Sequence, residues 1–136
     1  MDNLAATNLI VRVFVATGFI YFVTATVLLA LNLNGIIAVE NDPIFILALY
    51  GFVAQLIFGV SYIFVPGVSH TKFASYKSAV VEYVLLNIGL IVLVSSMLLT
   101  GYRSLAVIGA AALILSVLIH AANIWSITMP KKTSHS

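Results

Sequence analysis

The sequence predicts an all-α integral membrane protein, a four-helix bundle with up-down-up-down topology that forms a single transmembrane domain over residues 1–136. Two observations predict this fold. Of the 136 residues, 62% are hydrophobic and only 7% are charged, whereas soluble domains have about 25% charged residues. The chain also contains four apolar segments, and each exceeds the ~20 residues that a helix needs to cross the hydrocarbon core. Helices satisfy their own backbone hydrogen bonds in lipid, so these segments are expected to be helical.

Short connectors with turn and cap residues separate the four segments. Asp42-Pro43 is typical of a helix start, with an acidic N-cap before a proline at the first helical position. Pro66-Gly67, Thr100-Gly101 and Pro130 are expected to end the second, third and fourth helices. The predicted helices cover residues 8–31, 43–65, 76–99 and 105–128.

Basic residues are distributed unevenly between the two predicted sides of the membrane. Only Arg103 falls on the side that also carries Glu40 and Asp42. Since Lys and Arg accumulate in cytoplasmic loops, the bias predicts a multi-pass protein of the cell membrane with both termini in the cytoplasm. The basic residues on the predicted cytoplasmic side are Arg12, Lys72, Lys77, Lys131 and Lys132.

The composition excludes several classes of function. The chain contains no cysteine, which removes disulfides, zinc–thiolate sites, iron–sulfur clusters and thiol catalysis. The three histidines are scattered over a loop, a span and the tail, so they do not supply a nucleophile, base and orienting group together. The net charge of +2 comes without a basic patch, so membrane lipid is an expected partner and nucleic acid is not.

Polar side chains inside the spans are costly and predict a cluster. Glu82 and His120 are expected in the cytoplasmic half of the bilayer, and Asn123 shares a helix face with His120. Two interpretations stay open: a hydrogen-bonded network that fixes the bundle, or a proton relay. No metal site is predicted, because such sites need three or more protein ligands and the spans offer only Glu82 and His120 as candidates. The predicted cluster comprises Arg12, Gln55, Glu82, Asn87, His120 and Asn123.

Small residues recur every four positions on two helices. Gly51, Gln55 and Gly59 follow this spacing on the second helix. Ala112 and Ser116 precede His120 with the same spacing on the fourth. Such faces let helices approach closely, although the same clearance would also admit a flat cofactor.

Aromatic residues near the ends of the spans are expected to form an interfacial belt. Tyr62 and Trp125 lie toward the predicted cytoplasmic edge, and Tyr50 and Tyr102 lie toward the other edge.

Three stretches carry a family resemblance: GFVAQLIFGVSYIFVP on the second helix, EYVLLNIGL at 82–90, and HAANIWSITMP at 120–130. Over nearly its full length, the chain resembles the small four-helix membrane proteins related to haem-copper oxidase (cytochrome c oxidase) subunit I. Those proteins correspond to a four-helix portion of that larger subunit. The resemblance implies the same bundle architecture for this chain.

The haem-ligand histidines of these relatives are missing here. Ile46 or its neighbours, Ile63 and Glu82 stand at the matching positions. Haem iron is held by an axial His, Met, Cys or Tyr, which leaves Tyr62 and Met97 as formal possibilities. No cofactor is therefore predicted, and haem or copper remains an alternative.

Three functions stay open. The leading expectation is a non-catalytic integral membrane subunit of a larger complex, such as a respiratory oxidase or a copper membrane monooxygenase like ammonia monooxygenase. Its partners would be other integral membrane subunits, and the chain would be an accessory subunit rather than an enzyme. The alternative is a haem- or copper-binding redox membrane protein. The further alternative is a small proton channel or transporter around Glu82 and His120, although a conducting path needs polar lining across the full membrane depth.

Overall fold

The computed structural model describes residues 3–71, 75–99 and 103–129. These residues form helices and connectors, and no strand occurs among them. Predicted features at Lys72, Thr100-Gly101, Tyr102, Pro130, Lys131 and Lys132 lie outside the described residues. The elements in chain order are α1 (Asn3–Leu33), α2 (Asn41–Ile46), the π-helical segment η1 (Leu47–Ala54), α3 (Gln55–Ser69), α4 (Tyr76–Leu98) and α5 (Arg103–Thr128).

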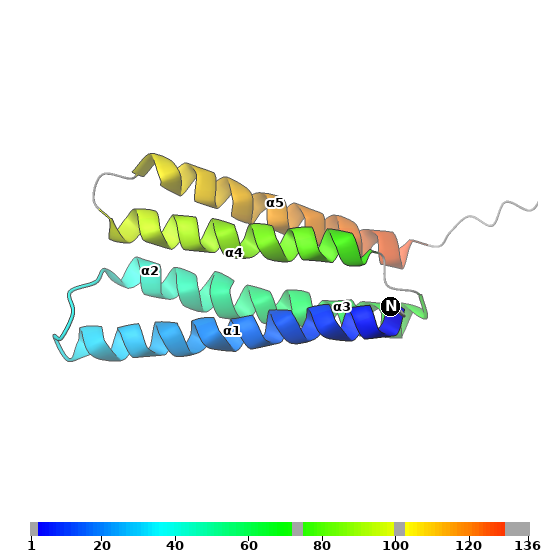
Figure 1. Cartoon of the computed structure of the whole chain (residues 1–136), viewed down its shortest axis with the longest axis horizontal. Coiled ribbons are helices and arrows are strands. Elements are labelled where there is room, and N and C mark those ends of the chain that lie inside the picture. Colours follow the sequence, from blue (N-terminus) through cyan, green and yellow to red (C-terminus); the bar gives the residue numbers. More distant parts are fainter. Residues whose placement is uncertain (1–2, 72–74, 100–102, 130–136) are drawn as a thin grey trace, which may run out of the picture.

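Four stretches of the described chain are long and apolar enough to cross a membrane. Since α2, η1 and α3 run on as one continuous rod (Figure 1), the six elements make four spans. The four-helix bundle is confirmed, and the chain is a multi-pass integral membrane protein. The spans are Thr7–Leu33, Asn41–Ser69, Tyr76–Leu98 and Ser104–Thr128.

The end of the second span differs from the prediction. The helix does not stop before Pro66, as expected, but continues to Ser69. Proline lacks only its own N–H donor, and the last turn is closed by the backbone N–H of His70, which donates to the Pro66 carbonyl. His70 is the C-cap and adopts the left-handed conformation with φ 52°. Of the other predicted helix limits, residues 76 and 128 match the observed ones, and the rest differ by one to five residues.

The bundle consists of two antiparallel helix pairs that pack side by side (Figure 1). In one pair, α1 runs against η1 and α3, so that Gly18 lies near Gln55 while Gly59 lies near Phe14. In the other pair, α4 runs against α5. Contacts of α3 with α5 and of α1 with α4 join the two pairs.

Burial in this molecule is the reverse of that in a soluble domain. Gln55 and Glu82 are fully buried, whereas many large apolar side chains face outward on all four spans. Lipid is as apolar as these side chains, so outward apolar surface costs nothing there, while polar groups need partners inside the protein. The interior therefore contains the polar chemistry of the chain.

The predicted packing glycines of the second span are buried against α1. A Cβ on Gly51 would lie 2.6 Å from Cγ of Tyr21, and a Cβ on Gly59 would lie 3.0 Å from Cβ of Phe14. The distance at Gly51 is shorter than real Cβ atoms show, and the distance at Gly59 would require its neighbour to shift slightly, so both positions favour glycine. Gly51 lies inside η1, whose wider turn is a rare element within membrane and soluble helices alike.

The α4–α5 pair approaches even more closely. A Cβ on Gly109 would lie 2.6 Å from the backbone nitrogen of Leu93, and a Cβ on Gly89 would lie 2.9 Å from the carbonyl oxygen of Gly109. The nearest neighbours here are backbone atoms rather than flexible side chains. Ala112, a predicted packing residue, faces Gly89 in the same contact.

Candidate functional site

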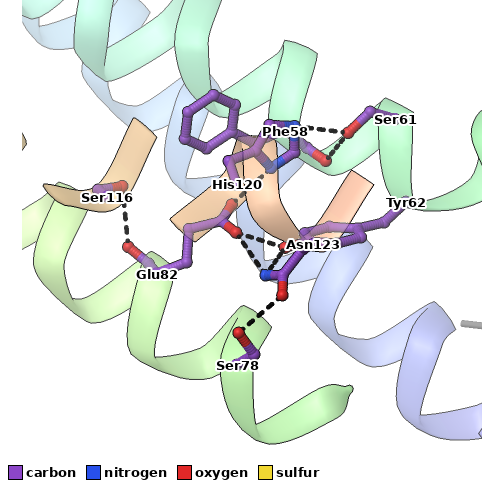
Figure 2. A network of polar contacts seen from close by, with 8 residues as sticks. All are labelled: Phe58, Ser61, Tyr62, Ser78, Glu82, Ser116, His120 and Asn123. Carbon is purple, nitrogen blue, oxygen red and sulfur yellow. Dashed lines mark hydrogen bonds and ion pairs between the residues drawn. The ribbon is translucent and has the colours of Figure 1, made fainter. Parts of the chain in front are cut away.

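Three helices place polar side chains around the carboxylate of Glu82 (Figure 2). Oε1 of Glu82 lies 2.9 Å from Nδ1 of His120 on α5. Oε2 accepts hydrogen bonds from the hydroxyl of Tyr62 on α3 and from Nδ2 of Asn123, the latter at 3.2 Å. Both carboxylate oxygens are therefore satisfied by this chain, as a buried acid requires.

Helix periodicity explains why these side chains meet. Ser78 precedes Glu82 by four residues on α4, and Asn123 follows His120 by three on α5, so each pair shares a face. Because α4 and α5 are antiparallel, Ser78 reaches Asn123, with Oγ donating to Oδ1 at 2.8 Å. Ser116, one turn before His120, donates to the backbone carbonyl of Glu82 at 3.2 Å.

His120 connects Glu82 to the second span. Its Nε2 lies 3.0 Å from Oγ of Ser61, and its ring stacks on Phe58 with 3.9 Å between centroids and 6° between planes. Tyr62 meets the same imidazole edge-on. The ring is thus fixed on both nitrogens and on one face, which leaves it no freedom to turn without breaking contacts.

The direction of the Ser61 hydrogen bond is linked to the number of protons that the Glu82–His120 pair holds. When Ser61 Oγ donates its only hydrogen to the Phe58 carbonyl, 2.8 Å away, it accepts from Nε2 of His120. The contact between Nδ1 and Oε1 of Glu82 then needs one more proton, carried by the imidazolium or by the carboxylic acid. In either arrangement the pair has no net charge, which suits its burial.

Asn123 completes the inner network. Its Nδ2 donates to the hydroxyl of Tyr62 at 2.8 Å as well as to Glu82. Since Oδ1 accepts from Ser78, the amide orientation is determined by its partners. We call Ser61, Tyr62, Ser78, Glu82, His120 and Asn123 the inner network.

A second polar group lies one to two turns farther along α4. Oδ1 of Asn87 accepts from the hydroxyl of Tyr21 at 2.9 Å and from Nε2 of Gln55 at 3.0 Å. Nearby, the hydroxyls of Thr17 and Tyr83 are 2.7 Å apart. Oε1 of Gln55 is buried and has no hydrogen-bond partner among the described residues. Beyond Asn87, α4 presents Leu90 and Val94 to the core, and the buried Ser96 donates to the Leu93 carbonyl of its own helix. Within the described part of the chain, the polar contacts between helices therefore end near mid-span.

The structure separates the predicted cluster into three parts. Glu82, His120 and Asn123 meet in the inner network, whereas Gln55 and Asn87 pair with each other. The expectation that Arg12 joins them is wrong, because its side chain is exposed. Among the described residues, no ion pair links Arg12 to Glu82. A long basic side chain near a helix end reaches outward rather than into a network that is already neutral.

The aromatic belt prediction is wrong for Tyr62, whose side chain is only 1% exposed and donates to Glu82. Trp125 is 65% exposed, as a belt residue should be, and Tyr50 is half-buried. The position of a tyrosine along a predicted span does not tell whether its side chain points toward lipid or toward the core. The signal that could have done so is the spacing of Gln55, Gly59 and Tyr62, which places Tyr62 on the same helix face as the buried glutamine and glycine.

The positions that the family resemblance would match to haem ligands do not converge. Ile63 points outward with 53% of its surface exposed, whereas Glu82 is fully buried and Ile46 is half-buried. Met97, the other formal ligand candidate, follows Glu82 by 15 residues on α4, about four helical turns away. Among the described residues, no group of three or more His, Asp or Glu could hold a metal ion.

Comparison of this chain with known proteins identifies no family. No family model, no curated protein and no solved structure matches it.

Proposed function

We propose that the chain is a non-catalytic integral membrane subunit of a larger membrane complex. The observation that carries this proposal is the closure of the inner network. Both oxygens of the Glu82 carboxylate and both ring nitrogens of His120 are bonded to side chains of the same chain. Neither residue offers an open position for a substrate or a metal while these bonds persist, which suits a group that fixes helices.

The outward faces support the same proposal. Large apolar side chains project from every span, among them Phe19, Phe64 and Val107. Such faces pack against lipid or against helices of a partner. Little of the described chain lies outside the spans, so contacts with a partner would occur mainly inside the membrane. The resemblance to oxidase-related bundles makes a respiratory oxidase the first candidate complex, and a copper membrane monooxygenase such as ammonia monooxygenase the second.

The test is purification of the full chain from its native membranes in a mild detergent, followed by native gel separation and mass spectrometry. We expect a species much larger than the 14.6 kDa chain, with stoichiometric integral membrane subunits. Migration as a detergent-solubilised monomer without partners, in several detergents, would refute the proposal.

The location in the cell membrane with cytoplasmic termini is part of the same proposal, based on the basic residues. The chain has no cysteine, so single cysteines report topology without background. We expect Ser136→Cys to react with a membrane-impermeant maleimide only after permeabilisation, and Asn41→Cys to react in intact cells. The reverse pattern would contradict the proposed orientation.

The two alternatives receive less support from the site. The ligands of a haem or copper centre would have to come from His120, Tyr62, Met97 and Glu82. Tyr62 and His120 are already hydrogen-bonded to Glu82. A channel would need polar lining beyond Asn87, where Leu90 and Val94 are buried instead. An absorption spectrum of the purified chain without a Soret band, and without stoichiometric copper, is the expected result.

A further inference from the structure

The Glu82–His120 pair has a feature that a purely structural contact does not need. Its hydrogen bonds can be rearranged without moving any heavy atom, because Ser61 Oγ lies within bonding distance of two acceptors. It donates to the Phe58 carbonyl at 2.8 Å in the present arrangement, and Nε2 of His120 lies 3.0 Å away. The hydroxyl hydrogen of Ser61 can therefore point to the Phe58 carbonyl or, when Nε2 of His120 carries no hydrogen, to Nε2. These are two alternative hydrogen-bonding arrangements of the same side chains.

The two states differ by one proton. When Ser61 accepts from Nε2–H, Glu82 and His120 together hold two titratable protons and the pair is neutral. When Ser61 donates to Nε2 instead, His120 is the neutral Nδ1–H tautomer, which donates to the Glu82 carboxylate. The pair then holds one titratable proton and has a charge of −1. In both states each ring nitrogen and each carboxylate oxygen keeps its partner.

We propose that Glu82, His120 and Ser61 form a reversible one-proton binding site in the interior of the bundle. Protonation takes one proton from water and turns the Ser61 hydroxyl toward the Phe58 carbonyl; deprotonation returns that proton to water and turns the hydroxyl toward Nε2. Tyr62 and Asn123, which donate two hydrogen bonds to Oε2, stabilise the anionic state. The site needs no metal and no redox partner.

The surroundings of the pair contain few other titratable groups. From α3 comes Tyr62, and from α4 comes Tyr83, whose hydroxyl is bonded to Thr17 of α1 at 2.7 Å. The nearest ring from α1 is the apolar side chain of Phe14, which contacts Tyr62 and Tyr83. Among the described residues no Lys or Arg lies within ion-pair distance of Glu82, so the charge of the pair depends on its own protons.

Access from water is expected at one end only. Ser78 lies in the first turn of α4 and is half-buried, next to the exposed cap residue Ser75. It bonds Asn123, which in turn bonds Glu82 (Figure 2). On the other side, Leu90 and Val94 close the interior. Among the described residues, the pair therefore lies closest to water at the end of the bundle that carries Ser75 and Ser78, and we expect proton exchange from that side of the membrane.

The test uses nuclear magnetic resonance on the full chain in lipid nanodiscs. The sequence contains only two glutamates, Glu40 and Glu82, so ¹³Cδ-labelled glutamate gives two signals, and Glu40→Gln assigns the exposed one. Imidazole ¹⁵N signals report the histidines in the same sample, and His70→Gln and His135→Gln identify the signals of His120. We expect the Glu82 and His120 signals to shift together in a single transition as the pH is changed.

Two variants test the role of Ser61 without removing the acid. Ser61→Ala removes the rotating hydroxyl, and we expect the midpoint to move by about one pH unit or more, the size of a lost buried hydrogen bond. Ser61→Thr retains a hydroxyl and should restore the original midpoint. Thr24→Ala, at an exposed position on α1 whose hydroxyl donates to the Ile20 carbonyl, is the matched control and should leave it unchanged.

Signals of Glu82 and His120 that stay constant over the whole pH range would overturn the proposal, as would a midpoint that is insensitive to Ser61→Ala. Neither result depends on which proteins accompany the chain in native membranes, so this test and the co-purification test fail independently.

Discussion

Near the start of α4, Glu82 meets α5 through polar side chains, whereas farther along the same helix pair Gly89 and Gly109 bring the two backbones into contact. In both regions, two apolar helices must associate inside lipid. Apolar side chains gain little by leaving lipid for a protein interior, so helix pairs in membranes depend on close packing and on hydrogen bonds. The first region uses hydrogen bonds and tolerates some distance between backbones. The second uses direct contact, so its tolerance for added atoms is small.

The largest expected effect is the loss of the carboxylate in the polar region. Glu82→Leu leaves the donors of Tyr62 and Asn123 without their acceptor and His120 without its partner. Removal of one member of a buried pair costs about 3–5 kcal/mol. We expect this loss in the free energy of unfolding, measured by SDS titration with far-UV circular dichroism.

Glu82→Gln is the comparison variant, because its amide retains an acceptor for Tyr62 and a donor toward Nδ1 of His120. We expect it to lose about half as much stability or less. If the Leu and Gln variants were equally unstable, shape rather than hydrogen bonding would dominate this region.

The glycine contact should rank second. Gly109→Ala places a methyl group against the backbone nitrogen of Leu93, a neighbour that cannot rotate away. Overpacking of this kind costs about 1–3 kcal/mol, and we expect α5 to separate from α4 first. Steric trapping of the α4–α5 pair measures this effect directly.

Gly67→Ala is the matched control for the glycine prediction, since a Cβ at this position would meet no neighbouring atom within 4 Å. It should leave stability unchanged or raise it slightly, because alanine favours helices over glycine. A similar loss in both variants would mean that helix propensity, not contact, sets the response.

A smaller effect is expected at Gly51. Here the added methyl group meets Cγ and Cβ of Tyr21 at 2.6 and 2.7 Å, and a shift of the Tyr21 side chain together with α1 would relieve the contact. The movement would break the hydrogen bond from Tyr21 to Asn87, at about 1–2 kcal/mol in total. In Tyr21→Phe, which already lacks that bond, Gly51→Ala should cost less, and a double-mutant cycle of thermal unfolding measures the difference. Additive losses would contradict this mechanism.

The smallest effect is expected at Gln55, although this side chain is fully buried. Its Oε1 has no partner among the described residues, and Asn87 keeps the bond from Tyr21 when Gln55 is replaced. Gln55→Met preserves the length of the side chain and removes the unpaired oxygen, so we expect a change within about 1 kcal/mol. A loss above about 2 kcal/mol in thermal unfolding would show that Oε1 has a bonding partner in the membrane.

The sequence was sufficient for the four spans because hydropathy and length carry that information directly. It also placed Glu82, His120 and Asn123 together, since the i+3 spacing and the antiparallel course of adjacent helices bring these residues to one level. It did not place Arg12, because depth along a helix says nothing about the direction in which a side chain points.

Other features of the structure were not predicted from the sequence, for a different reason. The π-helical segment Leu47–Ala54 has no residue pattern that separates it from an α-helix, and its path depends on packing against Tyr21 and Leu90. The inward direction of Tyr62 depends on a partner that is distant in sequence. The α4–α5 contact at Gly89 and Gly109 would have been accessible, since both are isolated glycines in apolar helices, a pattern typical of close approach.

The chain order of the inner network has a consequence for biosynthesis. Glu82 precedes His120 by 38 residues and Asn123 by 41, so the acid leaves the ribosome well before either partner on α5. Tyr62, 20 residues upstream, is the one inner-network partner of the carboxylate that is already made. The membrane-insertion machinery therefore has to accept the third span while the Glu82 carboxylate has only some of its hydrogen-bond partners. Release of that span into lipid is favoured once the fourth span has been translated.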